Sequence, residues 1–221
     1  MTRNPPPRDR FAHERQLVEQ GLLRIVGVDE VGRGSLAGPV AAAAVILPRE
    51  WVLRGIPAEL EGLNDSKQLT ASARERFHDA ILACPEIVWA VEMIDADVID
   101  QINILQATHR AMNQALASLS PAPDHVLVDG LRVSSITLPQ TALVRGDSLS
   151  YSIAAASVLA KVTRDRLMTA HDVCYPGYAF ARNKGYGTAA HLAALQTLGP
   201  SPIHRRTFMP SALRQAELFS S

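Results

Sequence analysis

Residues 23–47 read LRIVGVDEVGRGSLAGPVAAAAVIL, and this stretch decides the fold. The segment 22–28 is apolar and β-branched, and it predicts a strand that ends at Asp29 and Glu30. A glycine-rich turn follows, and the short apolar segment 40–47 predicts a second strand. Tight turns between two such segments favour an antiparallel hairpin.

Outward from this hairpin, the patterning mixes strands and helices. A short helix is expected at residues 11–20. Ser72, with Glu75 three residues later, is typical of a capping box and predicts a helix that runs to about residue 82. Further strands are expected at 87–94, 125–128 and 142–144, and further helices at 96–119, with a break near Asn103, at 150–168 and at 188–198. This mixed order indicates an α/β fold with a mixed sheet.

The composition is that of one large globular domain. The chain has 221 residues, of which 47% are hydrophobic and 20% charged, which excludes wholesale disorder. The longest apolar run, residues 40–47, is far shorter than the roughly 20 residues of a membrane helix. The first twenty residues contain no apolar signal core. Two unpatterned cysteines argue against a disulfide framework or a zinc site, so we expect a cytoplasmic protein.

The charges balance overall but are unevenly distributed. Lys and Arg number 22, as do Asp and Glu, which argues against non-specific coating of nucleic acid. Residues 158–214 hold eight basic and two acidic residues, a net charge of +6, which leaves −6 on the rest of the chain. This distribution is typical of a protein that binds a polyanion through one part and cations through another. The alternative is chance segregation of solvated surface charge.

Four carboxylates stand where the predicted strands stop: Asp29, Glu30, Asp129 and Asp147. Strand ends are where α/β sheets carry their sites. Oxygen ligands without cysteine or clustered histidine select Mg²⁺ or Mn²⁺. Converging acids repel one another unless cations neutralise them, and a pair of such ions supports phosphoryl transfer.

Simpler interpretations of some of these acids stay open. Asp147 precedes Ser148 and a predicted helix, so it could serve as an N-cap. Asp129 and Gly130 form a common turn pair. The adjacent acids Asp29 and Glu30 have no capping role of this kind. Spacing leaves open whether the four acids meet.

The glycine-rich turn admits three interpretations. Residues 27–32 begin like a phosphate loop, but Arg33 and Gly34 replace the required Lys and Ser or Thr, so that match fails. Gly32, Gly34 and Ala37 fit a loose dinucleotide fingerprint, which demands a helix where a strand is predicted. In the third interpretation, Gly32, Arg33 and Gly34 let the backbone approach a nucleic-acid strand closely.

Six motifs occur in the order seen in type 2 ribonucleases H. They are VDEVGRG at 28–34, LNDSK at 63–67, VDG at 128–130, RGDS at 145–148, AASVLAKVTRD at 155–165 and KGYGT at 184–188. From about residue 23 to residue 208, the sequence resembles the bacterial ribonuclease HII group. Ribonuclease HIII carries a substantial additional N-terminal domain, whereas only some 22 residues precede the first predicted strand here, which favours HII.

The resemblance implies a ribonuclease H-like mixed sheet flanked by helices, with a small helical C-terminal part. Its expected divisions are an N-terminal extension (1–22), a catalytic domain (23–170) and a substrate-binding part (171–221). It also implies hydrolysis of the RNA strand of RNA–DNA hybrids and incision 5′ to ribonucleotides embedded in duplex DNA. A hybrid-binding protein without turnover, and a DNA-directed nuclease of the same fold, are the alternatives. We expect a monomer, with a sliding-clamp contact possible in the tail after Arg214.

By the family's pattern, the four acids hold two Mg²⁺ or Mn²⁺ ions. Asp29 would bridge the two ions, and Asp147 would share the ion on the side of the attacking water. Asp129, with Glu30 nearby, would hold the ion that faces the leaving 3′ oxygen.

The resemblance also implies residues that recognise the substrate. Gly32, Arg33 and Gly34 match the loop that contacts the 2′-hydroxyl of the ribonucleotide, and Tyr186 matches a tyrosine that stacks on the following sugar. The basic residues expected at phosphates are Lys67, Arg145, Lys161, Arg164 and Lys184, with solvated loop or helix-end positions as the alternative.

The sequence departs from the family's pattern at two places. Asn183 stands where the family commonly has histidine, which puts a proton-shuttle role there in doubt. Arg145 stands where lysine is frequent, and we expect little change because both are cationic. Arg205 and Arg206 are expected either to touch phosphates or to form a plain surface patch.

Overall fold

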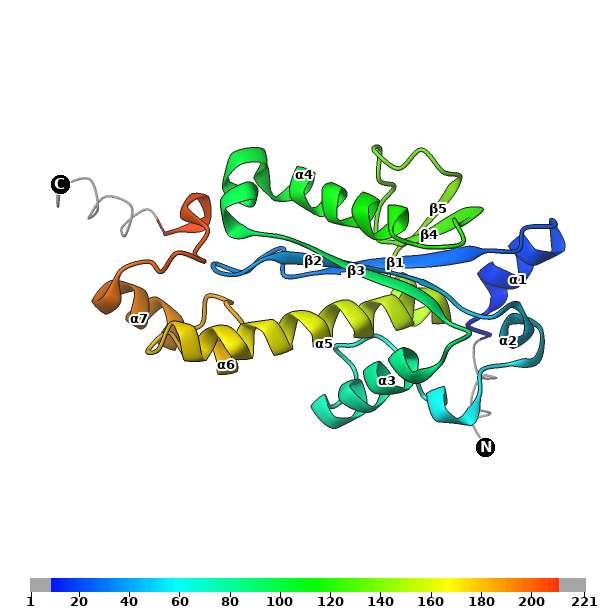
Figure 1. Ribbon diagram of the computed structural model, residues 1–221, viewed down its shortest axis with the longest axis horizontal. Helices are drawn as coiled ribbons and strands as arrows, with labels where there is room; N and C mark the ends of the chain where they lie inside the picture. Colours follow the sequence, from blue (N-terminus) through cyan, green and yellow to red (C-terminus); the bar gives the residue numbers. More distant parts are fainter. Residues whose placement is uncertain (1–8, 211–221) are drawn as a thin grey trace, which may run out of the picture.

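The computed structural model describes residues 9–210 and contains a five-stranded mixed sheet in the order β3-β2-β1-β4-β5 (Figure 1). The strands are β1 (Ile25–Val31), β2 (Val40–Ile46), β3 (Val88–Ile94), β4 (His125–Asp129) and β5 (Gln140–Leu143). The central strand β1 runs antiparallel to β2 and parallel to β4. The hairpin expected from residues 22–47 is therefore confirmed, and so is the mixed sheet.

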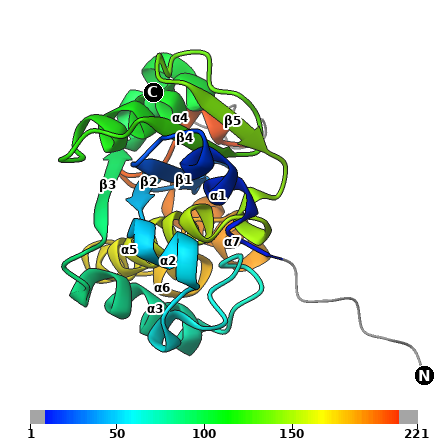
Figure 2. The same ribbon diagram turned by 90° about the vertical axis from the view of Figure 1, so that its right-hand side faces the viewer.

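Helices cover both faces of the sheet. They are α1 (Ala12–Glu19), α2 (Arg49–Arg54), α3 (Ala71–Ala83), α4 (Ala96–Ala117), α5 (Tyr151–Cys174), α6 (Phe180–Asn183) and α7 (Ala189–Leu198). Helix α4 lies on one face, and α5 with α3 lies on the other (Figures 1 and 2). The helices α6 and α7 lie around the far end of α5, where Met168, Phe180 and Leu195 form a small third core. This is the arrangement that the family resemblance implies, a mixed sheet flanked by helices with a small helical C-terminal part.

Side chains alternate along β1, and this alternation decides which of them face α5 and which face α4. Val26 and Val28 pack with the α4 face, while Gly27 lies directly against α5. A Cβ on Gly27 would stand 2.1 Å from the carbonyl carbon of Ser152, so only glycine lets α5 approach the strand this closely. Because side chains alternate along a strand, Asp29 lies on the α5 face like Gly27.

Several boundaries differ from the sequence prediction. Strand β1 continues through Asp29 and Glu30, because pairing with Ala43 and Ala42 of β2 extends it. Helix α3 is capped by Thr70, whose hydroxyl accepts a hydrogen bond from the Ala73 amide at 3.2 Å, and not by a box starting at Ser72. The short helix α6 was not expected. The break in α4 is confirmed at Asn103, where φ is +68°.

The segment before β1 is packed onto the core. Phe11, Leu17 and Val18 are buried in the cluster that α5 and α3 form with the sheet. At the other end, α5 runs six residues beyond the expected end at 168 and crosses the expected division at 170. Its buried Met168 packs with Ala37 beside β2 and with Phe180 and Leu195 of the C-terminal helices.

Within residues 9–210, no helix combines the length and the apolar character needed to cross a membrane.

Candidate active site

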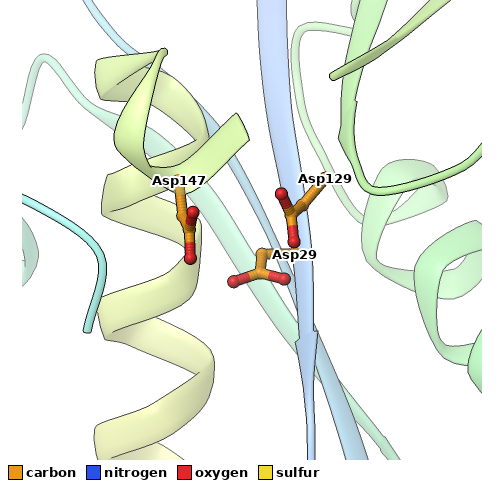
Figure 3. A group of neighbouring side chains, drawn as sticks. All are labelled: Asp29, Asp129 and Asp147. Atoms are coloured by element: carbon orange, nitrogen blue, oxygen red, sulfur yellow. The ribbon is translucent and has the colours of Figure 1, made fainter. Parts of the chain in front are cut away.

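Three aspartates meet at one end of the sheet, between β1, β4 and the start of α5. One carboxylate oxygen from each of Asp29, Asp129 and Asp147 lies within 4.8 Å of the others (Figure 3). Parallel pairing of Val28 with Val128 puts the next residues, Asp29 and Asp129, side by side. Asp147 comes from the short 3-10 turn just before α5. The three acids that the sequence places at strand ends are therefore gathered in space.

Burial and mutual repulsion disfavour the ionised form of these acids. Burial, and then the charges of Glu30 and Asp129, raise the pKa of Asp29 well above its usual value. Burial, followed by the charges of Asp129 and Asp65, raises the pKa of Asp147 to about 6. A cluster of carboxylate oxygens without sulfur or imidazole fits hard divalent cations, and a bound cation would relieve this repulsion. The donor set therefore fits Mg²⁺ or Mn²⁺.

Hydrogen bonds fix the turn that carries Asp147. Oδ1 of Asp129 accepts from the Gly146 amide at 2.6 Å, which ties β4 to the turn. The N-cap of α5 is Ser150, whose hydroxyl accepts from the Ile153 amide at 3.2 Å. The interpretation of Asp147 as a helix cap is therefore wrong. Asp129 does precede a turn glycine, Gly130 with φ +81°, but its carboxylate still faces the cluster.

Glu30 is not one of the three acids whose oxygens lie within 4.8 Å of one another, although its charge acts on Asp29. It follows Asp29 in the strand, so its side chain leaves from the other face of the sheet. Its carboxylate lies 3.4 Å from the Arg33 guanidinium. Burial raises the pKa of Glu30, Asp129 raises it further, and Arg33 opposes the rise. Among the described residues, the structure thus brings together three of the four expected acids.

A cleft of about 590 Å³ opens beside Asp129 and Asp147. Lys67 and Arg145, two of the expected phosphate contacts, are exposed and line it. Burial lowers the pKa of Lys67, but the carboxylates of the cluster, Asp29 first, raise it above its ordinary value overall. An ammonium group that strongly keeps its proton beside acids is suited to contact a phosphate.

Sequence reasoning missed three residues around the cluster. Asp65 lines the cleft, and its carboxylate interacts with that of Asp147. Ser157 of α5 faces Asp29, and its hydroxyl partly offsets the rise in the pKa of Asp29. The hydroxyls of Ser66 and Ser157 are 3.0 Å apart, which joins the 63–67 loop to α5. These residues belong to the motifs LNDSK (63–67) and AASVLAKVTRD (155–165), of which only the lysines and the arginine were predicted to contact the substrate.

The glycine-rich turn is held by a buried arginine from the C-terminal part. Arg205 donates to the carbonyl oxygens of Gly32 (2.7 Å), Arg33 (2.9 Å) and Gly38 (3.0 Å). It is fully buried, and burial, followed by the charge of Arg164, lowers its pKa to about 9. Of the two interpretations given to Arg205, phosphate contact and surface patch, neither fits a side chain buried against main-chain carbonyls.

Arg164 has the same kind of environment. It is 0% exposed. Its guanidinium donates to Pro39 O (2.8 Å), Lys184 O (2.9 Å), Ser35 Oγ (2.9 Å) and Ala37 O (3.1 Å). A Cβ on Gly32, where φ is +89°, would stand 2.2 Å from Nε of Arg164, so the glycine is needed for this packing. The direct phosphate contact expected of Arg164 does not fit its burial.

The other expected contacts surround Tyr186, which is half-buried. Its ring centroid lies 5.6 Å from the Arg164 guanidinium carbon and 5.9 Å from Nζ of Lys161. Lys161 also pairs with Asp165 at 2.9 Å. Lys184 donates to the Thr169 hydroxyl at 2.7 Å, so its ammonium group is directed along α5.

Two further polar groups shape the Tyr186 loop. Asn183 is buried, donates to Tyr178 O at 2.7 Å and accepts from the Gly185 amide at 2.8 Å. Its role is structural, and an amide cannot shuttle a proton. His191 Nδ1 donates to Tyr186 O at 3.0 Å, and its Nε2 lies 2.9 Å from Nε2 of His204. This buried histidine pair therefore fixes the main chain at Tyr186.

Comparisons with known proteins agree with this geometry. The family model for ribonuclease HII matches residues 26–210. The ribonuclease HII of Chloroflexus aurantiacus is 54% identical over 197 residues, covering 89% of this chain and 92% of its own. The structure of ribonuclease H2 from Pyrococcus horikoshii superposes with a TM-score of 0.72 and 25% identity, over 89% of this chain and 98% of that one.

A second solved structure, the PCNA:RNase HII complex from Archaeoglobus fulgidus, gives a TM-score of 0.69 at 22% identity, over 85% of this chain and 96% of that one. At this identity the likeness concerns the fold alone. The family match and the Chloroflexus relative, together with the three clustered aspartates, bear out the resemblance seen in the sequence. The chain belongs to the ribonuclease HII family of metal-dependent ribonucleases.

Proposed function

We propose that this chain hydrolyses the RNA strand of RNA–DNA hybrids and incises 5′ to ribonucleotides embedded in duplex DNA, leaving 3′-hydroxyl and 5′-phosphate ends. The observation that carries the proposal is the cluster of Asp29, Asp129 and Asp147, within 4.8 Å of one another beside an open cleft. Lys67 and Arg145 on the cleft wall supply the positive charge that a phosphodiester needs. Family membership supports activity on hybrids.

The three aspartates would hold two divalent cations, Mg²⁺ or Mn²⁺. When bound, such cations lower the pKa of a water nucleophile and stabilise the charge on the leaving 3′ oxygen. Asp29, between the other two acids, is the proposed bridging ligand, with Asp147 on the side of the attacking water and Asp129 on the leaving-group side. Glu30 is proposed as the fourth ligand, beside Asp129. To bind a cation it must exchange its Arg33 partner for the metal.

The remaining chemistry falls to residues that position the substrate. Lys67 and Arg145 would bind phosphates on either side of the scissile bond. Ser157 keeps the Asp29 carboxylate in place from the α5 side. No covalent intermediate is part of this proposal, because water is the nucleophile.

Selection of the ribonucleotide is proposed for the loop of Gly32, Arg33 and Gly34. Arg33 and Gly34 are exposed, and a Cβ on Gly34 would meet nothing within 4 Å. Internal packing therefore does not require glycine at Gly34, which is consistent with room kept for a 2′-hydroxyl. Tyr186 is proposed to stack on the next sugar, with Lys161 at the neighbouring phosphate.

Arg164 and Lys184 are proposed as positioning residues rather than direct contacts. Together with Arg205, Arg164 fixes the carbonyls of the glycine-rich turn. Lys184 accepts from Arg164 through its own carbonyl, which joins that turn to the Tyr186 loop.

We further propose that residues 23–170 carry catalysis and residues 171–221 substrate binding, in a monomer whose acids all come from one chain. A sliding-clamp contact is proposed for the tail after Arg214. The tail lies outside the described residues. Support comes from the Archaeoglobus neighbour, whose structure is a PCNA:RNase HII complex.

Three labelled duplexes test the proposal: an RNA–DNA hybrid, a DNA duplex with one ribonucleotide, and an all-DNA duplex. With Mg²⁺, we expect cleavage of the first two, a cut 5′ to the lone ribonucleotide, and an intact third. Hybrid retention in a gel shift without any cleavage would instead identify a binding protein. Cleavage of the all-DNA duplex would identify a DNA-directed nuclease.

A further inference from the structure

We infer that Arg10 is a positioning residue of the active site, which holds the turn bearing Asp147 in register with the loop bearing Lys67. The inference rests on the proposed function, because it assigns to Asp147 the role of a metal ligand. Arg10 precedes the first strand, in the part of the sequence expected to be an extension. The structure instead places its guanidinium against the carbonyl oxygens of Leu63 and Asp147.

The guanidinium of Arg10 joins two segments that lie far apart in the sequence. Nη1 donates to the carbonyl oxygen of Leu63, and Nη2 donates to the carbonyl oxygen of Asp147. Leu63 starts the loop that contains Asp65 and Lys67, and both segments line the cleft. Because a guanidinium is planar and its donors are fixed relative to one another, two such bonds set the distance between the segments.

The rest of the N-terminal segment anchors Arg10 on the first turn of α5. The carbonyl oxygen of Arg10 accepts from the Tyr151 amide at 3.1 Å. The carboxylate of Glu14, which is fully buried, accepts from the Ser150 hydroxyl at 2.5 Å and from the Ser152 amide at 3.2 Å. These contacts satisfy amides at the helix N-terminus, where negative charge is favoured.

Aromatic contacts complete the anchor. The Arg10 guanidinium carbon lies 4.7 Å from the centroid of the Tyr151 ring, and the Phe11 ring centroid lies 4.8 Å from the same ring. Stacking on Tyr151 restricts the guanidinium to one orientation. The guanidinium is therefore oriented toward the carbonyl oxygens of Leu63 and Asp147 before any ligand binds.

The main chain around Asp147 is thus tied from two sides. On one side Asp129 accepts from the Gly146 amide, and on the other Arg10 donates to Asp147 O. Without the two hydrogen bonds of the Arg10 guanidinium the turn can move. The carboxylates that must meet at the cation then move apart. The glycine-rich turn and Tyr186 are fixed independently, by Arg205 and His191. The loop bearing Lys67 keeps a second tie to α5 through the hydroxyls of Ser66 and Ser157, so the effect should fall on metal binding and kcat and leave KM for the hybrid within 2-fold.

The experiment compares Arg10→Gln and Arg10→Lys with the wild type and with Arg15→Gln, a half-buried arginine of α1 whose partner is Asp9. Mn²⁺ binding is measured by titration calorimetry without nucleic acid. Hybrid cleavage gives kcat and KM, and urea unfolding gives stability. For Arg10→Gln we expect the Mn²⁺ Kd to rise and kcat at subsaturating Mn²⁺ to fall, each about 10-fold, with KM within 2-fold. Saturating Mn²⁺ should restore much of kcat.

Arg10→Lys keeps the charge over Tyr151 but lacks the planar guanidinium, so its Mn²⁺ Kd should rise as well, and Arg15→Gln should match the wild type. If Arg10→Gln does not fold, the Mn²⁺ Kd of Arg10→Lys alone tests the inference. An unchanged Mn²⁺ Kd in the folded Arg10 variants, or a rise matched by Arg15→Gln, overturns the inference. The calorimetry needs no substrate, so it tests Arg10 even if the wild type cleaves no hybrid, a result that would remove the proposed function alone.

Discussion

Two regions of the molecule, the aspartate cluster and the glycine-rich turn, bury charges of opposite sign and neutralise them differently. On one side, Asp29 and Asp147 are buried beside Asp129, and repulsion raises the pKa of Asp29 and Asp147. On the other side, Arg164 and Arg205 are wholly buried, but their guanidinium groups donate to main-chain carbonyls. The acids thus depend on an exchangeable partner, whereas the arginines have permanent ones.

Because of this difference, the acids are suited to bind ions, whereas the arginines fix the shape of the main chain. Carbonyl oxygens cannot dissociate, so Arg164 and Arg205 lock the glycine-rich turn into one shape. Carboxylates crowded together are unstable until a divalent cation arrives, so the acidic side is prepared to bind ions. Substitutions on the two sides should therefore fail in different assays.

The largest effect is expected for Asp29→Asn. Removing a central metal ligand should lower Mg²⁺-dependent hybrid cleavage by about 10³-fold or more, since the cation supplies most of the catalysis. Hybrid binding should change little, because the residues proposed to grip the duplex lie elsewhere. Single-turnover cleavage and gel shifts measure the two quantities.

Asp97→Asn, an exposed acid in the first turn of α4, is the matched control for lost negative charge. It should cleave like the wild type. Undiminished Mg²⁺-dependent cleavage by Asp29→Asn would remove Asp29 from the catalytic site.

On the opposite side, Arg205→Met should cost stability rather than only activity. It leaves the carbonyls of Gly32, Arg33 and Gly38 without their donor, and we expect a loss of about 3–5 kcal/mol in the free energy of unfolding. Urea denaturation measures the loss. The neighbouring Arg206 is exposed, so Arg206→Met is the control and should stay within about 0.5 kcal/mol of the wild type. Equal stability of the two variants would mean that Arg205 does not lock the turn.

A smaller effect, of opposite sign, is expected for Asp147→Asn without metal. The folded protein opposes ionisation of this acid, with its pKa at about 6, so the unfavourable contribution appears as pH rises from the unfolded pKa, near 4, through 6. At pH 8 the variant should be more stable than the wild type by about 1–2 kcal/mol, since solvent screens part of the repulsion, and near pH 4 the gain should vanish.

Thermal unfolding across this pH range, with EDTA or with Mg²⁺, checks the sign. Mg²⁺ should stabilise the wild type more than the variant, because the cation binds only the folded cluster. Destabilisation of the metal-free protein by Asp147→Asn at pH 8 would contradict the description of this side as charge left without a partner.

The smallest effect on stability is expected for Gly34→Ala, beside the arginine-held turn. The added methyl meets no atom within 4 Å, so the unfolding free energy should change by less than about 0.5 kcal/mol. Cleavage 5′ to a lone ribonucleotide should fall about 10-fold if the methyl takes the space of the sugar. Gly32→Ala, which would place a Cβ 2.2 Å from Arg164, should instead lose stability. Full activity of Gly34→Ala would remove this glycine from the substrate site.

The acidic side was largely predictable from the sequence. Apolar, β-branched segments that stop at an acid mark strand ends, and parallel pairing of β1 with β4 brings such ends together. Asp29, Asp129 and Asp147 could be named on that basis. Glu30 could not be placed, because β2 pairing extends the strand through it and so directs it to the other face. The residues of the N-terminal segment gave no signal of their link to Asp147.

The basic side was much less predictable, for a physical reason. Every residue has a carbonyl oxygen, so arginines that donate to the main chain leave no pattern in the sequence. Arg164 was therefore expected at a phosphate, and the buried bonds of Arg205 went unnoticed. Asn183 likewise reveals its role only through its contacts with Tyr178 and Gly185. The charge of an arginine does not tell whether its side chain is buried against main-chain carbonyls or exposed to bind a ligand.

The most direct test of the account is an anomalous-scattering map from crystals of the full chain grown with Mn²⁺. We predict peaks between Asp29, Asp129 and Asp147, with at least one carboxylate oxygen of each about 2.0–2.3 Å from manganese. Manganese bound elsewhere, with these three carboxylates left without a metal, would contradict the claim that they form the catalytic cation site.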